Sequence, residues 1–184
     1  EAELDRLRLA SEQAARVAAG PAAEALRQSE ERFRTAFDHA PIGMDLVGLD
    51  GRFLQVNAAL CELMGYSEQE MLARTFQDIT YPDDQQEDLA LVNRLLAGEI
   101  ASFQMEKRYV RKDGQIIWGR VNSSLVRDQQ GTPLYFLGQI ENITARVRAE
   151  EELRAALDDA QAANRAKGAF LGLDLTHTRG DLFR

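Results

Sequence analysis

Apolar residues repeat every three or four positions near both ends of the chain. Residues 1–19 show this spacing at Leu4, Leu7, Ser11, Ala14 and Ala18. The spacing is typical of a coiled-coil helix. We expect Gly20-Pro21 to interrupt this helix, because proline cannot continue its hydrogen bonding. A second register then runs through Ala22, Leu26, Ser29, Phe33 and Ala36. Near the other end, a helical pattern runs from 143 to about 171, with seam residues at Leu153, Leu157, Ala160 and Asn164.

Between these helices the pattern predicts two strands, three short or medium helices and three further strands. The strands are expected at 42–48, 52–56, 101–111, 115–127 and 132–142, and the helices at 58–64, 68–73 and 82–97. Turn residues separate the strands of each hairpin, as in Leu49-Asp50-Gly51. Five antiparallel strands with helices on one face place the chain in the α+β class.

Local signals indicate where the first two of these helices begin, and where the first one ends. Asn57 is a good N-cap for the first, which Gly65 should end. Ser67 with Glu70 three residues later forms a capping box for the second. On the third helix, the inward face is expected to consist of Leu89, Val92 and Leu96.

Composition excludes several classes of function. The 184 residues carry a net charge of −8, which argues against a nucleic-acid binder because phosphate recognition needs clustered positive charge. The one basic group, Lys107, Arg108, Arg111 and Lys112, is interpreted as a solvated strand edge. A single cysteine fits a reducing compartment. No apolar run approaches the roughly 20 residues of a membrane helix. We therefore expect a cytoplasmic domain that does not insert into a membrane, whose parent protein could be membrane-tethered.

No catalytic or metal-binding arrangement is visible. The two histidines, His39 and His177, are far apart and lack metal-ligand spacing. Neither a glycine-rich phosphate loop nor a Gly-x-Ser-x-Gly motif occurs. Cys61 lies among apolar residues, as a small core residue would. The chain itself is therefore not expected to be an enzyme.

Several short motifs resemble, in order and spacing, those of a PAS domain of the S-box type. They are Phe33-Arg34-Thr35-Ala36-Phe37, Ala40-Pro41-Ile42-Gly43-Met44, Leu49-Asp50-Gly51-Arg52, Gly65-Tyr66-Ser67, Tyr81-Pro82-Asp83-Asp84, Arg111-Lys112-Asp113-Gly114 and Asn142-Ile143-Thr144. The resemblance covers about Ser29–Leu153. It implies strand order 2-1-5-4-3 and a pocket between sheet and helices. It divides the chain into an N-terminal signalling helix (1–28), a PAS domain (29–144), a coiled-coil linker (145–171) and a truncated or degenerate start of an output domain (172–184).

The pocket implied by the resemblance would be mostly apolar, with Asn57 and Ser123 orienting a ligand. Its candidate lining is Met44, Leu46, Phe53, Asn57, Leu60, Met64, Leu72, Phe76, Ile79, Val92, Phe103, Met105, Val121, Ser123 and Leu137. The alternative is that these residues simply fill the core. The cofactor stays unknown: residues 73–77 lack the flavin-attacking cysteine of light-sensing relatives, and residues 83–97 lack the histidine of haem-binding relatives.

The resemblance also implies where a signal would leave the domain. Asn142, Ile143 and Thr144 occupy the family's Asp-Ile-Thr junction between the last strand and the output helix. Asn142 cannot form the ion pair of the family's aspartate, and Glu141 is the alternative source of that charge.

A parallel homodimer is expected from the two coiled-coil patterns. Its candidate interface consists of Leu4, Leu7, Leu26, Phe33, Trp118, Leu153 and Leu157. Trp118 is expected on the outer face of the sheet together with Tyr109 and Tyr135, where the N-terminal helix or a partner subunit would cover it.

The segment from Ala162 to Leu171 resembles the start of a histidine-kinase dimerisation helix, although Thr176 occupies the histidine position and His177 comes one residue late. The chain is therefore interpreted as the sensory or relay domain of a two-component sensor histidine kinase, with a small molecule as a candidate ligand. The alternatives are a module regulating a diguanylate cyclase and a flavin- or haem-bound redox or gas sensor.

Overall fold

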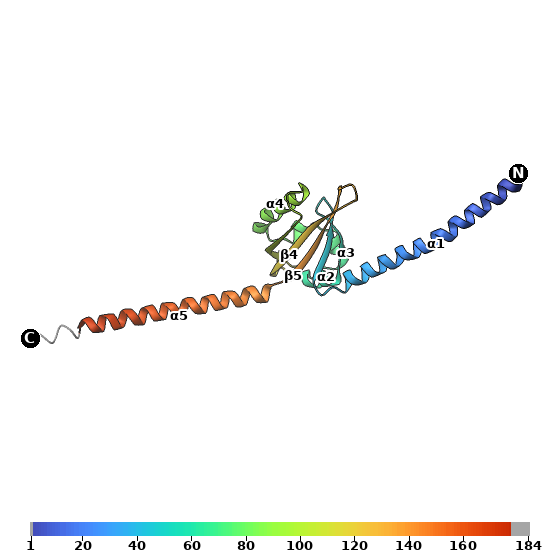
Figure 1. Ribbon diagram of the computed structural model, residues 1–184. Coiled ribbons are helices and arrows are strands. Elements are labelled where there is room, and N and C mark those ends of the chain that lie inside the picture. Colours follow the sequence, from blue (N-terminus) through green and yellow to red (C-terminus); the bar gives the residue numbers. More distant parts are fainter. Residues whose placement is uncertain (1, 178–184) are drawn as a thin grey trace, which may run out of the picture.

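The protein consists of one α+β domain from which two long helices extend in opposite directions (Figure 1). The computed structural model describes the backbone of residues 2–177 and the side chains of residues 20–167. The helices are α1 (Ala2–Asp38), α2 (Ala58–Met64), α3 (Glu68–Leu72), α4 (Gln85–Leu96) and α5 (Thr144–His177), with two 3-10 turns, η1 (Phe76–Ile79) and η2 (Pro82–Asp84). The strands are β1 (Gly43–Val47), β2 (Phe53–Val56), β3 (Ser102–Val110), β4 (Ile116–Arg127) and β5 (Pro133–Asn142).

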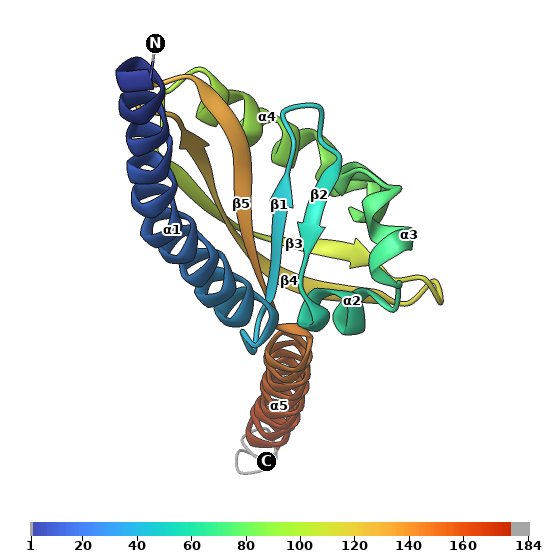
Figure 2. The same ribbon diagram turned by 90° about the vertical axis from the view of Figure 1, so that its right-hand side faces the viewer.

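The five strands form one antiparallel sheet in the order β2-β1-β5-β4-β3, which confirms the expected fold and strand order. The helices α2, α3 and α4 lie along the sheet (Figure 2). Gly43 at the start of β1 pairs with Ile140 near the end of β5. The end of α1 and the start of α5 therefore meet the domain at the same end of the sheet.

The predicted ends of α2 and the predicted start of α3 are confirmed, whereas the helix expected at 82–97 begins at Gln85, after the 3-10 turn η2. The Asn57 side chain accepts a hydrogen bond from the Leu60 amide at 2.9 Å, and Gly65 ends α2 with a positive φ of 77°. Ser67 and Glu70 form the expected capping box of α3. These features depend only on residues close together in the sequence, which is why they could be predicted.

The expected break at Gly20-Pro21 is wrong, because α1 is continuous through Pro21. A proline inside a helix removes one backbone hydrogen bond and costs about 3 kcal/mol. The Ala- and Glu-rich residues on both sides keep their own helical preference. One lost hydrogen bond therefore leaves the helix intact. The division of the chain at residues 28, 144 and 171 stays a prediction, and residues 178–184 of the expected output segment lie outside the described residues.

The inward face of α4 differs from the expected one. Leu89 is 42% exposed, whereas Asp88 is 3% exposed and Leu95 is fully buried. Val92 and Leu96 are half-buried. The helix is rotated because Asp88 pairs with a buried lysine on β3. A pattern that assigns acids to the solvent side cannot anticipate this contact.

The interpretation of the basic group as a solvated edge is wrong for Lys107. Side chains alternate between the two faces of a strand, so Lys107 shares the inner face of β3 with Phe103, Met105 and Tyr109. Lys107 is only 3% exposed. The same alternation buries Tyr109 and removes it from the outer surface expected to hold Trp118. Tyr135, on β5, is half-buried.

Candidate functional site

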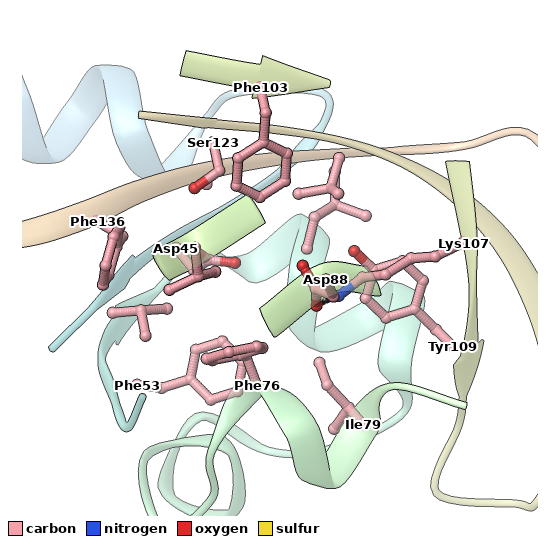
Figure 3. Close-up of a pocket in the computed structure, with 15 residues that line it drawn as sticks. Asp45, Phe53, Phe76, Ile79, Asp88, Phe103, Lys107, Tyr109, Ser123 and Phe136 are labelled. Carbon is pink, nitrogen blue, oxygen red and sulfur yellow. Dashed lines mark hydrogen bonds and ion pairs between the residues drawn. The ribbon is translucent and has the colours of Figure 1, made fainter. Parts of the chain in front are cut away.

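A small cavity lies between the inner face of the sheet and the segment from η1 to α4. Its volume is about 50 Å³, which is room for roughly three to five water molecules. Every strand contributes to its wall, as do Phe76 and Ile79 of η1 and Asp88 and Val92 of α4. Figure 3 shows these side chains converging on the cavity.

About half of the expected lining residues surround this cavity. They are Phe53, Phe76, Ile79, Val92, Phe103, Val121 and Ser123. A second group is buried or half-buried but lies away from the cavity: Asn57, Leu60, Met64, Leu72 and Met105.

Three expected lining residues are wrong: Met44, Leu46 and Leu137 lie on the other face of the sheet. In β1 the buried positions are Gly43, Asp45 and Val47, and in β5 they are Phe136, Gly138 and Ile140. Successive side chains of a strand point to opposite faces. The hydrophobic pattern predicts that the apolar neighbours of Asp45 point inward, because a buried aspartate is uncommon.

A buried ion pair forms one wall of the cavity. The Lys107 amino group pairs with the Asp88 carboxylate, and both side chains are about 4% exposed (Figure 3). Lys107 Nζ also donates to Thr80 Oγ1 at 2.9 Å and lies 4.7 Å from the centre of the Tyr109 ring. Burial lowers the pKa of Lys107, while the negative charges of Asp88 and Asp45 act against this shift.

A second carboxyl group, that of Asp45, lies inside the cavity at 5% exposure. Burial raises its pKa to about 7; the charge of Lys107 and the backbone N–H of Gly138 act in the opposite direction. Asp45 lies directly across from Gly138 in the sheet. A Cβ atom at position 138 would collide with the Asp45 carboxyl group, so this glycine makes room for it.

The hydroxyl group of Tyr109 is the third polar feature. Its oxygen is fully buried and has no hydrogen-bond partner among the described residues. Burial raises the pKa of Tyr109 well above its ordinary value. A Cβ atom at Gly119 on β4 would collide with the Tyr109 ring. Gly119 and Gly138 are therefore the sequence signals that could have indicated bulky polar residues on the facing strands.

The predicted junction residues join β5, β4 and the first turn of α5. The Ile143 amide donates to the Trp118 carbonyl at 3.0 Å, and the Trp118 amide donates to Thr144 Oγ1 at 3.0 Å. Asn142 Oδ1 accepts from the Thr144 amide at 3.0 Å. Glu141 pairs with Arg120 at 3.3 Å, so an ion pair exists beside the junction although Asn142 cannot form one.

A second set of contacts ties α5 to the outer face of the sheet. Arg146 pairs with Glu106 of β3 at 2.7 Å, and Glu106 also pairs with Arg120 of β4 at 3.1 Å. Glu106 and Lys107 are neighbours on β3 and point to opposite faces. The same strand therefore contacts the cavity on one side and the C-terminal helix on the other.

The candidate dimer residues lie mainly on the two long helices. Leu26, Phe33, Leu153 and Leu157 are all at least half exposed. Trp118 is half-buried, 5.8 Å from the Arg108 guanidinium. The side chains of Leu4 and Leu7 lie outside the described residues. The dimer interface stays a prediction.

The described side chains contain no group of three or more His, Cys, Asp or Glu residues that could hold a metal ion. Burial raises the pKa of the half-buried Cys61 thiol, and Glu68 and Glu62 add to the shift. None of the helices within residues 2–177 has the length and apolar character needed to cross a membrane.

Comparisons with known proteins identify the PAS fold in this chain. Residues 53–140 match the model of the PAS fold. The chain is 43% identical over 143 residues to the probable diguanylate cyclase DgcE of Escherichia coli and 28% identical over 129 residues to the sensor histidine kinase TmoS of Ectopseudomonas mendocina. These matches include 78% and 70% of this chain, but the chain spans only 13% of the length of each relative.

Among solved structures, the PAS domain of a protein from Colwellia psychrerythraea superposes with a TM-score of 0.59 at 21% identity. The match covers 62% of this chain and 97% of that one. At this identity the likeness shows the fold alone.

Proposed function

Because the folded domain of this chain is a PAS domain, we propose that it is a sensory relay that passes a change in its cavity to an output domain through α5. The domain itself performs no catalysis in this proposal. A ligand, a partner or the upstream helix α1 changes the cavity or the sheet. The change then alters the position or rotation of α5.

The observation that carries the proposal is the position of two neighbouring residues on β3. Lys107 forms the cavity's ion pair with Asp88, and Glu106 pairs with Arg146 in the first turn of α5. A displacement of this strand must change both contacts together. The hydrogen bonds between Trp118 and the Ile143–Thr144 junction give α5 a second attachment, on β4.

The incoming helix is attached close by. Phe37 near the end of α1 is buried, and its carbonyl accepts a hydrogen bond from Asn57 Nδ2 at 3.0 Å. Asn57 also accepts from the Met44 amide at 2.9 Å. Since α1 and α5 meet the sheet at the same end, a rotation of one helix can be transmitted to the other through the contacts at that end.

A parallel homodimer would turn this change into an output. Leu153 and Leu157 are the largest apolar side chains along the described part of α5, and both are more than half exposed. Pairing with a second copy would cover them, as in a coiled-coil seam. The single cysteine and the net charge of −8 fit a cytoplasmic protein that does not bind nucleic acid.

Two classes of output domain are supported by separate observations. The 43% identity to a probable diguanylate cyclase favours a cyclase. The segment from Ala162 to Leu171 and the likeness to a sensor histidine kinase favour a kinase. Assays of the parent protein for autophosphorylation and for cyclic di-GMP synthesis would decide between them.

A flavin or haem sensor has less support. Pockets for ligands of that size measure roughly 300–1,000 Å³, whereas this cavity measures about 50 Å³. Absorbance between 350 and 600 nm in the purified protein would favour the cofactor-bound alternative.

The relay is tested by cysteine crosslinking along α5. In a Cys61→Ser background, single cysteines at positions 150–164 are oxidised and the crosslinked dimer is quantified. The proposal predicts maxima at 153, 157, 160 and 164, because a parallel pair brings seam positions together every three or four residues. Equal, low crosslinking at all positions would overturn the paired-helix mechanism.

A further inference from the structure

The cavity contains two carboxyl groups and one amino group. When all three are ionised, Asp88 and Lys107 compensate each other and the charge of Asp45 is left over. A charge buried without a full partner is unfavourable, and it is neutralised by protonation or compensated by a ligand of opposite charge. The excess charge at this site is negative.

Other groups around Asp45 do not supply a second positive charge. Asp88 faces it from α4, and Lys107 and Tyr109 face it from β3. Ser123 of β4 and Gly138 of β5 carry no charge. Lys107 is already engaged by Asp88 and by Thr80.

Tyr109 gives an independent indication of a binding site. Tyr109 lines the cavity, and its buried hydroxyl group has no partner within the described part of the chain. A buried polar atom without a partner is costly, so such atoms commonly face a ligand or a water molecule. The phenol oxygen can accept a hydrogen bond from a donor placed in the cavity.

The rest of the wall suits a positive charge. Figure 3 shows the rings of Phe53, Phe76, Phe103 and Phe136 around the Asp45 carboxyl group. The negative face of an aromatic ring attracts cations at distances up to about 6 Å. An anionic ligand would instead place a second excess negative charge in the same small space.

We propose that this cavity binds a compact organic cation with a primary ammonium group, of the size of methylammonium, and that its binding is the signal relayed to α5. An ammonium group has three N–H donors, and the residues that line the cavity include three with acceptor oxygens, Asp45, Tyr109 and Ser123. The volume of about 50 Å³ limits the ligand to a few non-hydrogen atoms. The identification of the ligand as the signal rests on the proposed relay function; the binding itself does not.

Binding of a cation requires the ionised form of Asp45, so affinity should rise with pH. With a pKa of about 7, the ionised fraction in the free protein falls from about 0.9 at pH 8 to about 0.1 at pH 6. The dissociation constant should therefore be about tenfold higher at pH 6 than at pH 8. Ligands of about two non-hydrogen atoms reach at most roughly millimolar affinity, and this sets the concentrations needed.

The test is an NMR titration of the ¹⁵N-labelled 184-residue chain with methylammonium chloride up to about 100 mM, at pH 8 and pH 6. Sodium chloride, sodium acetate and ethanol serve as ionic, anionic and neutral controls. We expect saturable shifts of the amides of β1, β3 and β5 with methylammonium only, about tenfold weaker at pH 6. Shifts of equal size with ethanol or acetate, or no saturable shifts with methylammonium, would overturn the proposal.

Three variants make the test specific. Asp45→Asn should weaken binding at least tenfold at pH 8 and remove its pH dependence, and Tyr109→Phe should weaken it severalfold. Glu87→Gln, which removes an exposed acid from α4, should bind as the wild type does. Unchanged binding by a folded Asp45→Asn protein would refute the assignment. Tyr109→Phe provides the same test should Asp45→Asn fail to fold.

The two proposals fail separately. Crosslinking along α5 reports on the relay whether or not methylammonium binds. Shifts confined to the cavity, with an unchanged crosslinking pattern, would support the site and contradict the ligand's role as a signal.

Discussion

Replacing Asp45 by asparagine should stabilise the protein at pH 8. The carboxyl group of Asp45 has an ordinary pKa of 3.8 and a pKa of about 7 in the folded protein. An acid with a higher pKa in the folded state binds more protons when folded, so stability falls as pH rises from the lower value to the higher one. Above pH 7 the loss is complete.

The size of the effect follows from that shift of about three pKa units. Each unit corresponds to about 1.36 kcal/mol, so the ionised carboxylate destabilises the fold by up to about 4 kcal/mol. Asparagine has nearly the same shape and no charge. At pH 5 the wild-type side chain is protonated in the folded state, and the difference between the two proteins should fall to roughly 1.6 kcal/mol, because this pH lies about 1.2 units above the ordinary pKa.

Urea unfolding followed by circular dichroism at pH 5, 6, 7 and 8 measures this difference. Glu87→Gln serves as the matched control, since it removes an exposed acid and should change stability little at any of these values. Parallel pH dependence of Asp45→Asn and the wild type from pH 5 to 8 would contradict this prediction, because the pKa of Asp45 would then be ordinary.

Three further predictions concern the ion pair, the α2 cap and the dimer. Lys107→Met should destabilise the fold by about 3–5 kcal/mol in urea unfolding, since it leaves the buried Asp88 without its partner; the double variant with Asp88→Leu should recover much of that loss, and no recovery would contradict the pairing. Asn57→Ala should cost about 2–4 kcal/mol by the same measurement, because the side chain makes four buried or half-buried hydrogen bonds; a loss below 1 kcal/mol would contradict this role. Replacing Leu153 and Leu157 together by glutamine should give a monomer with an unchanged circular dichroism spectrum of the domain, measured by analytical ultracentrifugation; an unchanged dimer would move the interface to α1 or to the Trp118 face.

The sequence predicted those parts of the fold that depend on neighbouring residues. Asn57, Gly65 and the Ser67–Glu70 capping box each set a helix end through contacts within four residues. The strand order came from the resemblance of the motifs to a known family and not from periodicity. Pro21 did not end α1, because the residues on both sides keep their helical preference and only one hydrogen bond is lost.

The interior of the site could not be predicted in the same way. Asp45, Asp88 and Lys107 are charged, and a hydrophobic pattern places charged residues outside. They are buried because Lys107 and Asp88 pair across 19 residues of sequence and because Gly138 leaves space beside Asp45. Only the pairing of β3 with α4 and of β1 with β5 brings these groups together.

The relay claim is tested most directly by the distance between the α5 helices of a dimer. A spin label at Ala156→Cys in a Cys61→Ser background, measured by double electron–electron resonance, reports that distance. At pH 8 we expect one short distance, typical of parallel helices. This distance should shift when Asp45→Asn removes the cavity charge and should stay unchanged in Glu87→Gln. Identical distance distributions in all three proteins, or no coupling between labels, would contradict it.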